Sequence, residues 1–144
     1  MLEQPTPPQD LGAIGDAVRR CQVPILADQC ADDPDSALMV AANKLADGIC
    51  IKVATCGGIR PARLMNDLTR VAKLRTMVSC LIEPAMLIAG GLGVALSSPN
   101  VSYCDLDGHL DLVNDPSVPA FRLEDGDLIA PEVPGLGCRF DLGR

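Results

Sequence analysis

Five ionisable side chains of this sequence are placed where they could combine acid–base and metal chemistry. Glu3 lies in the opening stretch LEQP, Asp28 ends the apolar stretch VPILAD, Lys52 lies inside ICIKVAT, and Asp105 and Asp107 lie in CDLDG. Carboxylate oxygens are hard ligands that suit Mg²⁺, which takes a few protein carboxylates and keeps several waters. A lysine in a buried strand must either pair with a carboxylate or lower its pKa, and a lowered pKa makes it a general base.

Each of these residues also has a purely structural explanation. A single carboxylate at a strand end could form a salt bridge or lie at a solvated edge, and Lys52 could be held in a structural ion pair with one of the same carboxylates. A further acidic residue, Glu83, follows another apolar run. Polar groups at every consecutive strand end favour a functional site over a set of unrelated surface charges.

The segments between these residues predict the elements that position them. Apolar runs of strand length alternate with longer segments of helical period, which indicates an α/β fold with a parallel sheet. In parallel barrels the side chains at the carboxyl ends of the strands face one common site. Predicted strands cover residues 23–28, 49–55, 75–83 and 101–108, and predicted helices lie within residues 10–20, 33–46, 56–74 and 85–98.

The pattern of alternating predicted strands and helices ends after residue 113. The stretch FRLEDGDLIAP predicts two short extended segments joined by an Asp125-Gly126 turn, and EVPGLGCRFD predicts a closing strand. We therefore divide the chain into βα units at residues 1–113 and a tail at residues 114–144, whose hairpin is expected to lie over the main unit.

The composition argues against several classes of protein. Lys and Arg number 12 against 19 Asp and Glu, and the net charge of −7 disfavours a phosphate-binding surface, so no nucleic acid partner is expected. The seven cysteines include no CxxC pair, which supports neither a disulfide framework nor a thiolate zinc site. No stretch approaches the roughly 20 apolar residues that cross a membrane and no signal peptide is evident, so we expect no membrane partner and a cytoplasmic location.

Six stretches carry a resemblance to a known family. LEQP, PILAD, IKVATCGGI, SCLIEP, YCDLDG and PGLG resemble, in order and spacing, the mandelate racemase and muconate lactonizing branch of the enolase superfamily. The Asp-x-Asp of CDLDG is most similar to that of the dipeptide epimerases, such as L-Ala-D/L-Glu epimerase. The resemblance covers nearly the whole chain. It implies the C-terminal half of a modified (β/α)₇β TIM-type barrel, from the end of strand four to strand eight, with a C-terminal hairpin tail that packs with the capping region.

The resemblance also implies roles for the five residues. Glu3 and Asp28 match the Mg²⁺ ligands of the fourth and fifth barrel strands, and Lys52 matches one of two bases that face each other across the substrate α-carbon. Asp105 and Asp107 match the pair that holds the ammonium group of a dipeptide substrate. The implied reaction is epimerisation next to a carboxylate: a base removes a weakly acidic proton while the metal stabilises the ene-diolate.

Several family parts are expected to lie outside this chain. They are the N-terminal part of the capping domain, the first three strands, the third-strand metal ligand and a Lys-x-Lys segment with the second base. We therefore expect the isolated chain to be inactive. Half a barrel should also expose two strand edges and its apolar inner face, which self-association into a homo-oligomer would cover.

The sequence departs from the family pattern at two positions, and there are two alternative interpretations of its function. Gln29 stands where the family commonly has Glu, and Cys30 where Ser is frequent. One alternative is a muconate cycloisomerase or o-succinylbenzoate synthase type of enzyme, whose substrates carry no ammonium group for Asp105 and Asp107. The other is a truncated product without catalysis.

Overall fold

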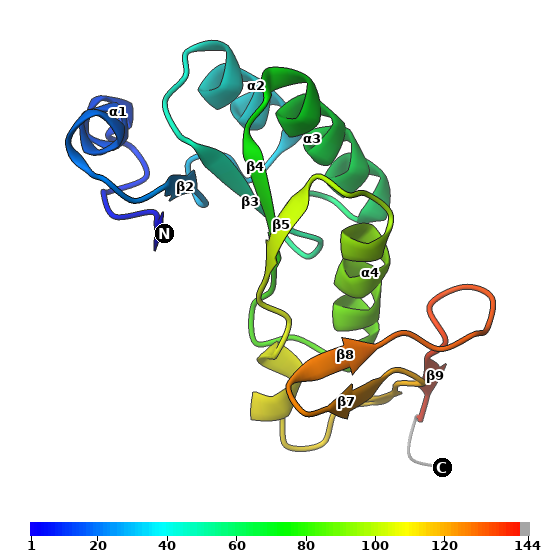
Figure 1. The fold of residues 1–144 in the computed structure, drawn as a ribbon. Coiled ribbons are helices and arrows are strands. Elements are labelled where there is room, and N and C mark those ends of the chain that lie inside the picture. The colour runs from blue at the N-terminus through cyan, green and yellow to red at the C-terminus, as the bar shows by residue number, and fades with distance from the viewer. Residues whose placement is uncertain (142–144) are drawn as a thin grey trace.

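The computed structural model describes residues 1–141, and its first part consists of repeated βα units (Figure 1). Five parallel strands pair in the order in which they occur in the chain, and the sheet curls like half of a barrel. The predicted α/β class with a parallel sheet is confirmed. The strands are β1 (Leu2–Glu3), β2 (Ile25–Ala27), β3 (Gly48–Lys52), β4 (Arg75–Ser79) and β5 (Val101–Cys104), and the helices are α1 (Leu11–Arg20), α2 (Pro34–Ala42), α3 (Ile59–Ala72) and α4 (Ala85–Leu96).

Short-range hydrogen bonds set the ends of the helices, as α2 illustrates. The Asp33 carboxylate accepts from the Ser36 amide at 2.8 Å, and the Ser36 hydroxyl accepts from the Asp33 amide at 3.1 Å, which forms a capping box. At the other end the Asn43 side chain donates to the Met39 carbonyl, and Lys44 has a φ of 52°. The helix therefore stops at Ala42, before the predicted end near residue 46.

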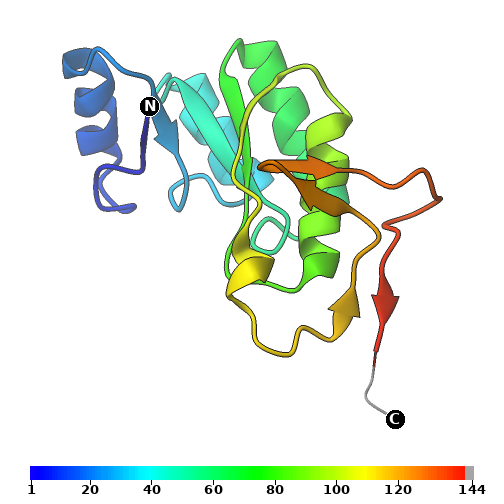
Figure 2. The same ribbon diagram turned by 60° about the horizontal axis from the view of Figure 1, so that its bottom comes forward.

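The main core lies between the helices and one face of the sheet. Figures 1 and 2 show α2, α3 and α4 on the same side of the strands, with the opposite side left open. Alternate residues of a strand point to the same face, so every second strand residue enters this core. The strand residues in it that have no exposed surface are Ile25, Ala27, Ile49, Ile51 and Val78.

A second, smaller cluster fills the inner face of the curled sheet. It contains Leu26, Cys50 and Met77, which are at most 3% exposed, with Tyr103 packed against them. The expectation that this inner face would be exposed is therefore wrong for its centre. Arg75, two residues before Met77 in the same strand, donates to the Tyr103 hydroxyl at 2.7 Å, so long polar side chains help to cover the small apolar layer.

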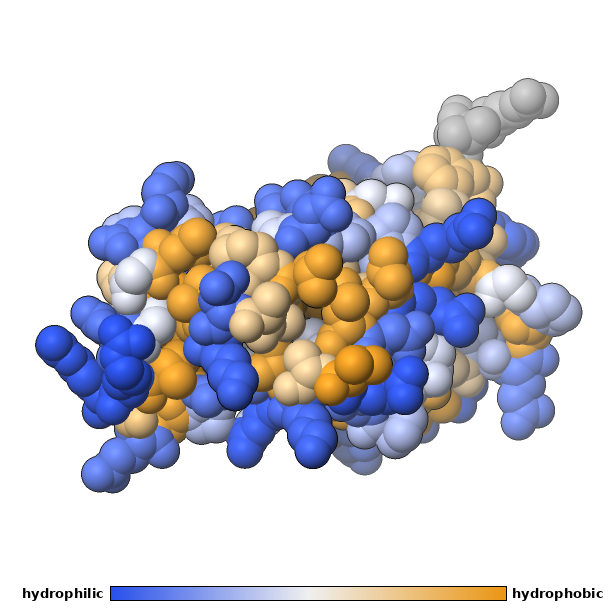
Figure 3. All heavy atoms as spheres, turned by 90° about the horizontal axis from the view of Figure 1, so that it is seen from above, coloured by the Kyte–Doolittle hydropathy of each residue, from blue (hydrophilic) through white to orange (hydrophobic). Residues whose placement is uncertain are grey.

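The edges of the sheet are open, as expected for half a barrel. β1 and β5 are the outer strands and pair on one side only. Seen from above, a band of apolar residues crosses the surface between hydrophilic ones (Figure 3). Across the described chain, Val71, Leu96 and Val113 are more than two-thirds exposed. No helix among the described residues is long and apolar enough to cross a membrane.

The tail is attached to the βα units at the start of α4. The short helix η1 (Gly108–Asp111) precedes the tail, whose elements are β6 (Ser117–Val118), β7 (Arg122–Glu124), β8 (Asp127–Ile129) and β9 (Arg139–Phe140). The Asp115 carboxylate accepts from the Ala85 amide at 2.6 Å, and the Ser117 hydroxyl accepts from the Met86 amide at 3.0 Å. The tail thus satisfies amides of α4 that Pro84, at the N-cap, leaves free.

The predicted hairpin is confirmed. β7 and β8 are antiparallel, and Asp125 and Gly126 between them both have positive φ, as a tight hairpin turn requires. The closing strand is shorter than predicted, and β9 pairs with β6 instead of the hairpin. The division of the chain at residue 113 stays a prediction, and residues 142–144 of the tail lie outside the described residues.

Candidate functional site

The carboxyl ends of β1, β2 and β3 bring together three of the predicted site residues. The Lys52 ammonium forms an ion pair with Asp28 through Oδ1, and its Nζ lies 3.4 Å from Glu3 Oε1. Lys52 and Asp28 are buried, whereas the Glu3 side chain retains about a third of its exposure. Parallel pairing of the three strands produces this arrangement, because each residue stands at the same edge of the sheet.

Burial and pairing compete in setting the acidity of these groups. Burial acts to lower the pKa of Lys52, but the hydrogen bond to Asp28 and the nearby carboxylate charges outweigh it and raise that pKa. Burial raises the pKa of Asp28, and the charge of Lys52 offsets only part of the increase. In this arrangement Lys52 is a charged ammonium, so it has to leave the ion pair and lose a proton before it can act as a base.

Gln4 joins the two strand ends that carry Glu3 and Asp28, a contact that sequence reasoning missed. Its Oε1 accepts from the Asp28 amide at 2.9 Å and from the Cys30 amide at 3.3 Å. Gln4 also has a φ of 36°, which turns the chain sharply after Glu3. The side chain therefore joins the end of β1 to the loop after β2. The LEQP motif contained this residue, but only the three-dimensional contact shows its function.

Cys50 is a second site residue that the sequence analysis did not single out. Its Sγ lies 3.5 Å from Glu3 Oε1 and 3.7 Å from Lys52 Nζ. Burial raises the pKa of its thiol to about 12. Period-two counting could have found it, because a residue two positions before Lys52 in a strand points to the same face.

The same residues fit a divalent cation. One potential ligand atom from each of Glu3, Asp28 and Cys50 lies within 4.8 Å of the other two. Two carboxylate oxygens suit Mg²⁺ with retained waters. The Lys52 ammonium already draws both carboxylates around one positive charge. The chemistry of this donor set therefore agrees with the metal that the family resemblance implies.

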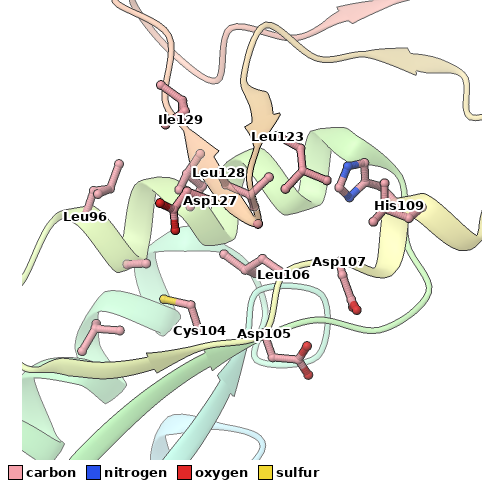
Figure 4. Close-up of a pocket in the computed structure, with 15 residues that line it drawn as sticks. Leu96, Cys104, Asp105, Leu106, Asp107, His109, Leu123, Asp127, Leu128 and Ile129 are labelled. Atoms are coloured by element: carbon pink, nitrogen blue, oxygen red, sulfur yellow. The ribbon is translucent and has the colours of Figure 1, made fainter.

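Asp105 and Asp107 stand at the other end of the same sheet edge. Both are exposed, and Asp105 Oδ2 accepts from the Ser79 hydroxyl at 3.4 Å. Ser79 in β4 is the register partner of Lys52 in β3, so Asp105, which follows β5, lies two strands beyond the lysine. In Figure 4 both carboxylates lie on one side of the loop after β5, whereas Leu106 points to the other side. No ion pair among the described residues involves either carboxylate.

A cavity of about 690 Å³ lies beside this loop, between α4, β5 and the β7–β8 hairpin. Leu96, Leu106, Leu123 and Leu128 contribute its apolar lining (Figure 4). The cavity flanks Asp105 and Asp107 but includes none of Glu3, Asp28 and Lys52. The cavity is thus separate from the ion-paired cluster, and it lies on the Leu106 side of the β5 loop, opposite the two carboxylates.

Glu83 lies between the two ends. Its side chain is 4% exposed, and its Oε2 accepts from the Leu81 amide at 3.4 Å. Burial raises the pKa of this carboxyl, and the positive charge of Lys52 partly opposes the increase. Glu83 is therefore electrostatically connected to the cluster at β1–β3, although no hydrogen bond joins it to Lys52 in the described chain.

Comparison with known proteins supports the family suggested by the motifs. The family model described as enolase C-terminal domain-like matches residues 1–143. The chain belongs to this family. It is 40% identical over 140 residues to the L-Lys-D/L-Arg epimerase of Methylococcus capsulatus, covering 94% of this chain and 38% of that protein. It is 30% identical to muconate cycloisomerase 1 of Rhodococcus opacus, with 99% and 38% covered.

A solved structure shows the same fold. The dipeptide epimerase of Methylococcus capsulatus, complexed with Mg and the dipeptide L-Arg-D-Lys, superposes with a TM-score of 0.86 at 36% identity. The superposition covers 96% of this chain and 39% of that one. The chain thus spans less than half the length of the relatives that it matches. Those relatives are isomerases by name, and the half-barrel corresponds to one part of their structure.

Proposed function

We propose that this chain forms the C-terminal part of the barrel of a Mg²⁺-dependent dipeptide epimerase, which exchanges the proton next to a substrate carboxylate through an ene-diolate. The observation that carries the proposal is the cluster of Lys52 with Glu3 and Asp28 on one edge of a parallel sheet. Removal of a weakly acidic α-proton requires a base close to a bound metal ion, and a lysine beside two metal-binding carboxylates provides both. The magnesium of the related Methylococcus capsulatus structure supports the same metal here.

Each described residue then has a defined task. Glu3 and Asp28 hold the metal, and Gln4 keeps their two strand ends together. Magnesium, when bound, supplies positive charge to the carboxylate of the substrate. Lys52 moves the proton at one face of the α-carbon once its ammonium is released from Asp28. The second base belongs to the part of the barrel outside this chain, so we expect the isolated chain to be inactive.

Asp105 and Asp107 favour a dipeptide over other carboxylates. They are exposed and without an ion-pair partner in the described chain, so they can accept charge-assisted hydrogen bonds from a substrate ammonium. A muconate has no such group. The similarity to the Rhodococcus opacus cycloisomerase keeps that reaction as the competing proposal.

A chimera tests the function directly. Residues 1–141 would replace the matching segment of the Methylococcus capsulatus epimerase, and the formation of epimers of L-Ala-L-Glu and L-Lys-L-Arg, which requires a base on each face of the α-carbon, would be followed. We expect turnover, and a loss of about 10²- to 10⁴-fold in Lys52→Ala, as for removal of a general base. Lys44→Ala, at an exposed turn, is the control. An active chimera indifferent to Lys52→Ala, or one that turns over only muconate, would refute the proposal.

A further inference from the structure

We propose that Cys50 is a third metal-binding group of this site, so that Glu3, Asp28 and Cys50 form a mixed oxygen and sulfur site that takes thiophilic divalent cations such as Zn²⁺ and Cd²⁺. The inference rests on the metal site of the proposed function and goes beyond it, because a site of hard oxygens alone selects Mg²⁺. No CxxC motif marks the site, because Glu3 lies in β1, Asp28 follows β2 and Cys50 lies in β3.

The arrangement of donors around Lys52 supports this assignment. The ammonium is in contact with Asp28, lies 3.4 Å from Glu3 Oε1 and lies 3.7 Å from Cys50 Sγ. A positive group thus already occupies a position that all three donor atoms surround. Cys50 is 2% exposed and Asp28 is 5% exposed, so neither is a flexible surface group that could point elsewhere without cost.

The spacing of the donors fits a tetrahedral ion. Zinc bonds of about 2.3 Å to sulfur and about 2.1 Å to oxygen separate the two ligand atoms by about 3.6 Å at a tetrahedral angle. The observed separation of Cys50 Sγ and Glu3 Oε1 is 3.5 Å. All three donor atoms lie within 4.8 Å of one another, so small side-chain movements complete the site.

The charges also balance. On binding, the S–H bond of Cys50 breaks, a sulfur–metal bond forms, and the proton passes to solvent. Two carboxylates and one thiolate around a divalent ion leave one negative charge. The Lys52 ammonium, displaced from the centre but still attached to the same strand, neutralises it, and Glu83 is near enough to interact with that ammonium.

Cadmium binding to the 144-residue chain tests the inference, because a cadmium–thiolate bond absorbs in the ultraviolet. The parent would carry Cys21→Ser and Cys104→Ser, which remove the two exposed thiols. We expect one equivalent of Cd²⁺ to produce the absorption. Cys50→Ser should abolish it, and Glu3→Gln should weaken binding more than about tenfold, as for loss of a ligand. Cys80→Ser, which changes another buried thiol, should leave it intact.

Parallel calorimetry with Mg²⁺ separates this inference from the proposed function. Mg²⁺ binding that depends on Glu3, together with a cadmium absorption that survives Cys50→Ser, would overturn the role of Cys50 alone. An absence of both Mg²⁺ and Cd²⁺ binding at Glu3 and Asp28 would overturn the metal site itself. Circular dichroism of each variant confirms that a lost signal reflects a lost ligand in a folded chain.

Discussion

The carboxylates at the two ends of one sheet edge lie in opposite environments, paired with a buried lysine at one end and exposed at the other. At β1–β3, Asp28 is buried and ion-paired with Lys52, and Glu3 lies beside the same ammonium. At β5, Asp105 and Asp107 are exposed and have no ion-pair partner among the described residues. A buried charge must be compensated within the protein, whereas an exposed one is compensated by water.

The difference separates two kinds of binding. A cation that binds at β1–β3 must displace an ammonium that the fold itself supplies. A positive group that binds to Asp105 and Asp107 at β5 displaces only water. The first end is thus suited to a strongly held divalent ion and the second to the weaker, exchangeable ammonium of a substrate.

Breaking the buried pair should have the largest effect on stability. Asp28→Asn leaves the Lys52 charge with only Glu3, so we expect the free energy of unfolding to fall by about 3 kcal/mol, the low end for a buried pair that loses one partner. Asp105→Asn is the control at the other end and should change stability by less than about 0.5 kcal/mol. Urea unfolding of both variants measures the difference in unfolding free energy. Equal losses of stability in the two variants would contradict the proposed difference between the two ends.

Removing the exposed carboxylates should affect catalysis instead. In the chimera, Asp105→Asn combined with Asp107→Asn should lower kcat/KM for a dipeptide by about 10- to 100-fold, because a hydrogen bond to a charged group contributes about 1.5–3 kcal/mol. The urea midpoint should not move. Unchanged kinetics in this variant would remove the argument for an ammonium-bearing substrate.

A substitution of Gln4 tests how the buried end is held together. Gln4→Ala removes the acceptor of two backbone amides, and we expect a loss of about 1–2 kcal/mol in unfolding free energy. Gln9→Ala, at an exposed position nearby, serves as the matched control. An equal, small effect of both substitutions would mean that water satisfies the two amides as well as Gln4 does.

The smallest effect is expected at Glu83, between the two ends. Because burial raises its pKa in the folded chain, the folded state keeps a proton that the unfolded state releases above about pH 4.5. The free energy of unfolding should therefore decrease as the pH rises from about 4.5 to the folded pKa. Glu83→Gln should flatten that decrease, whereas Glu132→Gln, at an exposed position, should not. Urea midpoints across this pH range provide the test.

Periodicity in the sequence was sufficient for the order of the elements and for the strand that carries Lys52. It was less accurate for strand ends: the predicted strand 75–83 stops at Ser79, and Leu81 and Ile82 are about half exposed or more. Apolar residues in a loop look like the continuation of a strand until their burial is known. The Asp125-Gly126 turn was predictable because its backbone requires residues that tolerate positive φ.

The site was predictable only where a strand ends in a charged residue. Alternation along β3 places Cys50 on the face of Lys52, but its contact with Glu3 and the contacts of Gln4 join strands far apart in the chain, and no local pattern encodes these contacts. The same holds for the inner face, where burial of Met77 results from the curl of the sheet and the Arg75–Tyr103 hydrogen bond. The family resemblance implied Glu3 and Asp28 as ligands and Lys52 as a base, which stay predictions, and it did not point to Gln4 or Cys50.

The strand order of the sheet has a consequence for how the chain folds. Each strand pairs with the strand before it, and α3 and α4 each pack on the two strands that flank them in the chain, so most contacts of a unit are with its neighbour in sequence. Such nearest-neighbour contacts close short loops, and short loops favour rapid folding. A growing polypeptide could therefore add this half of the barrel one unit at a time as it emerges from the ribosome, with β5 left last as the free edge.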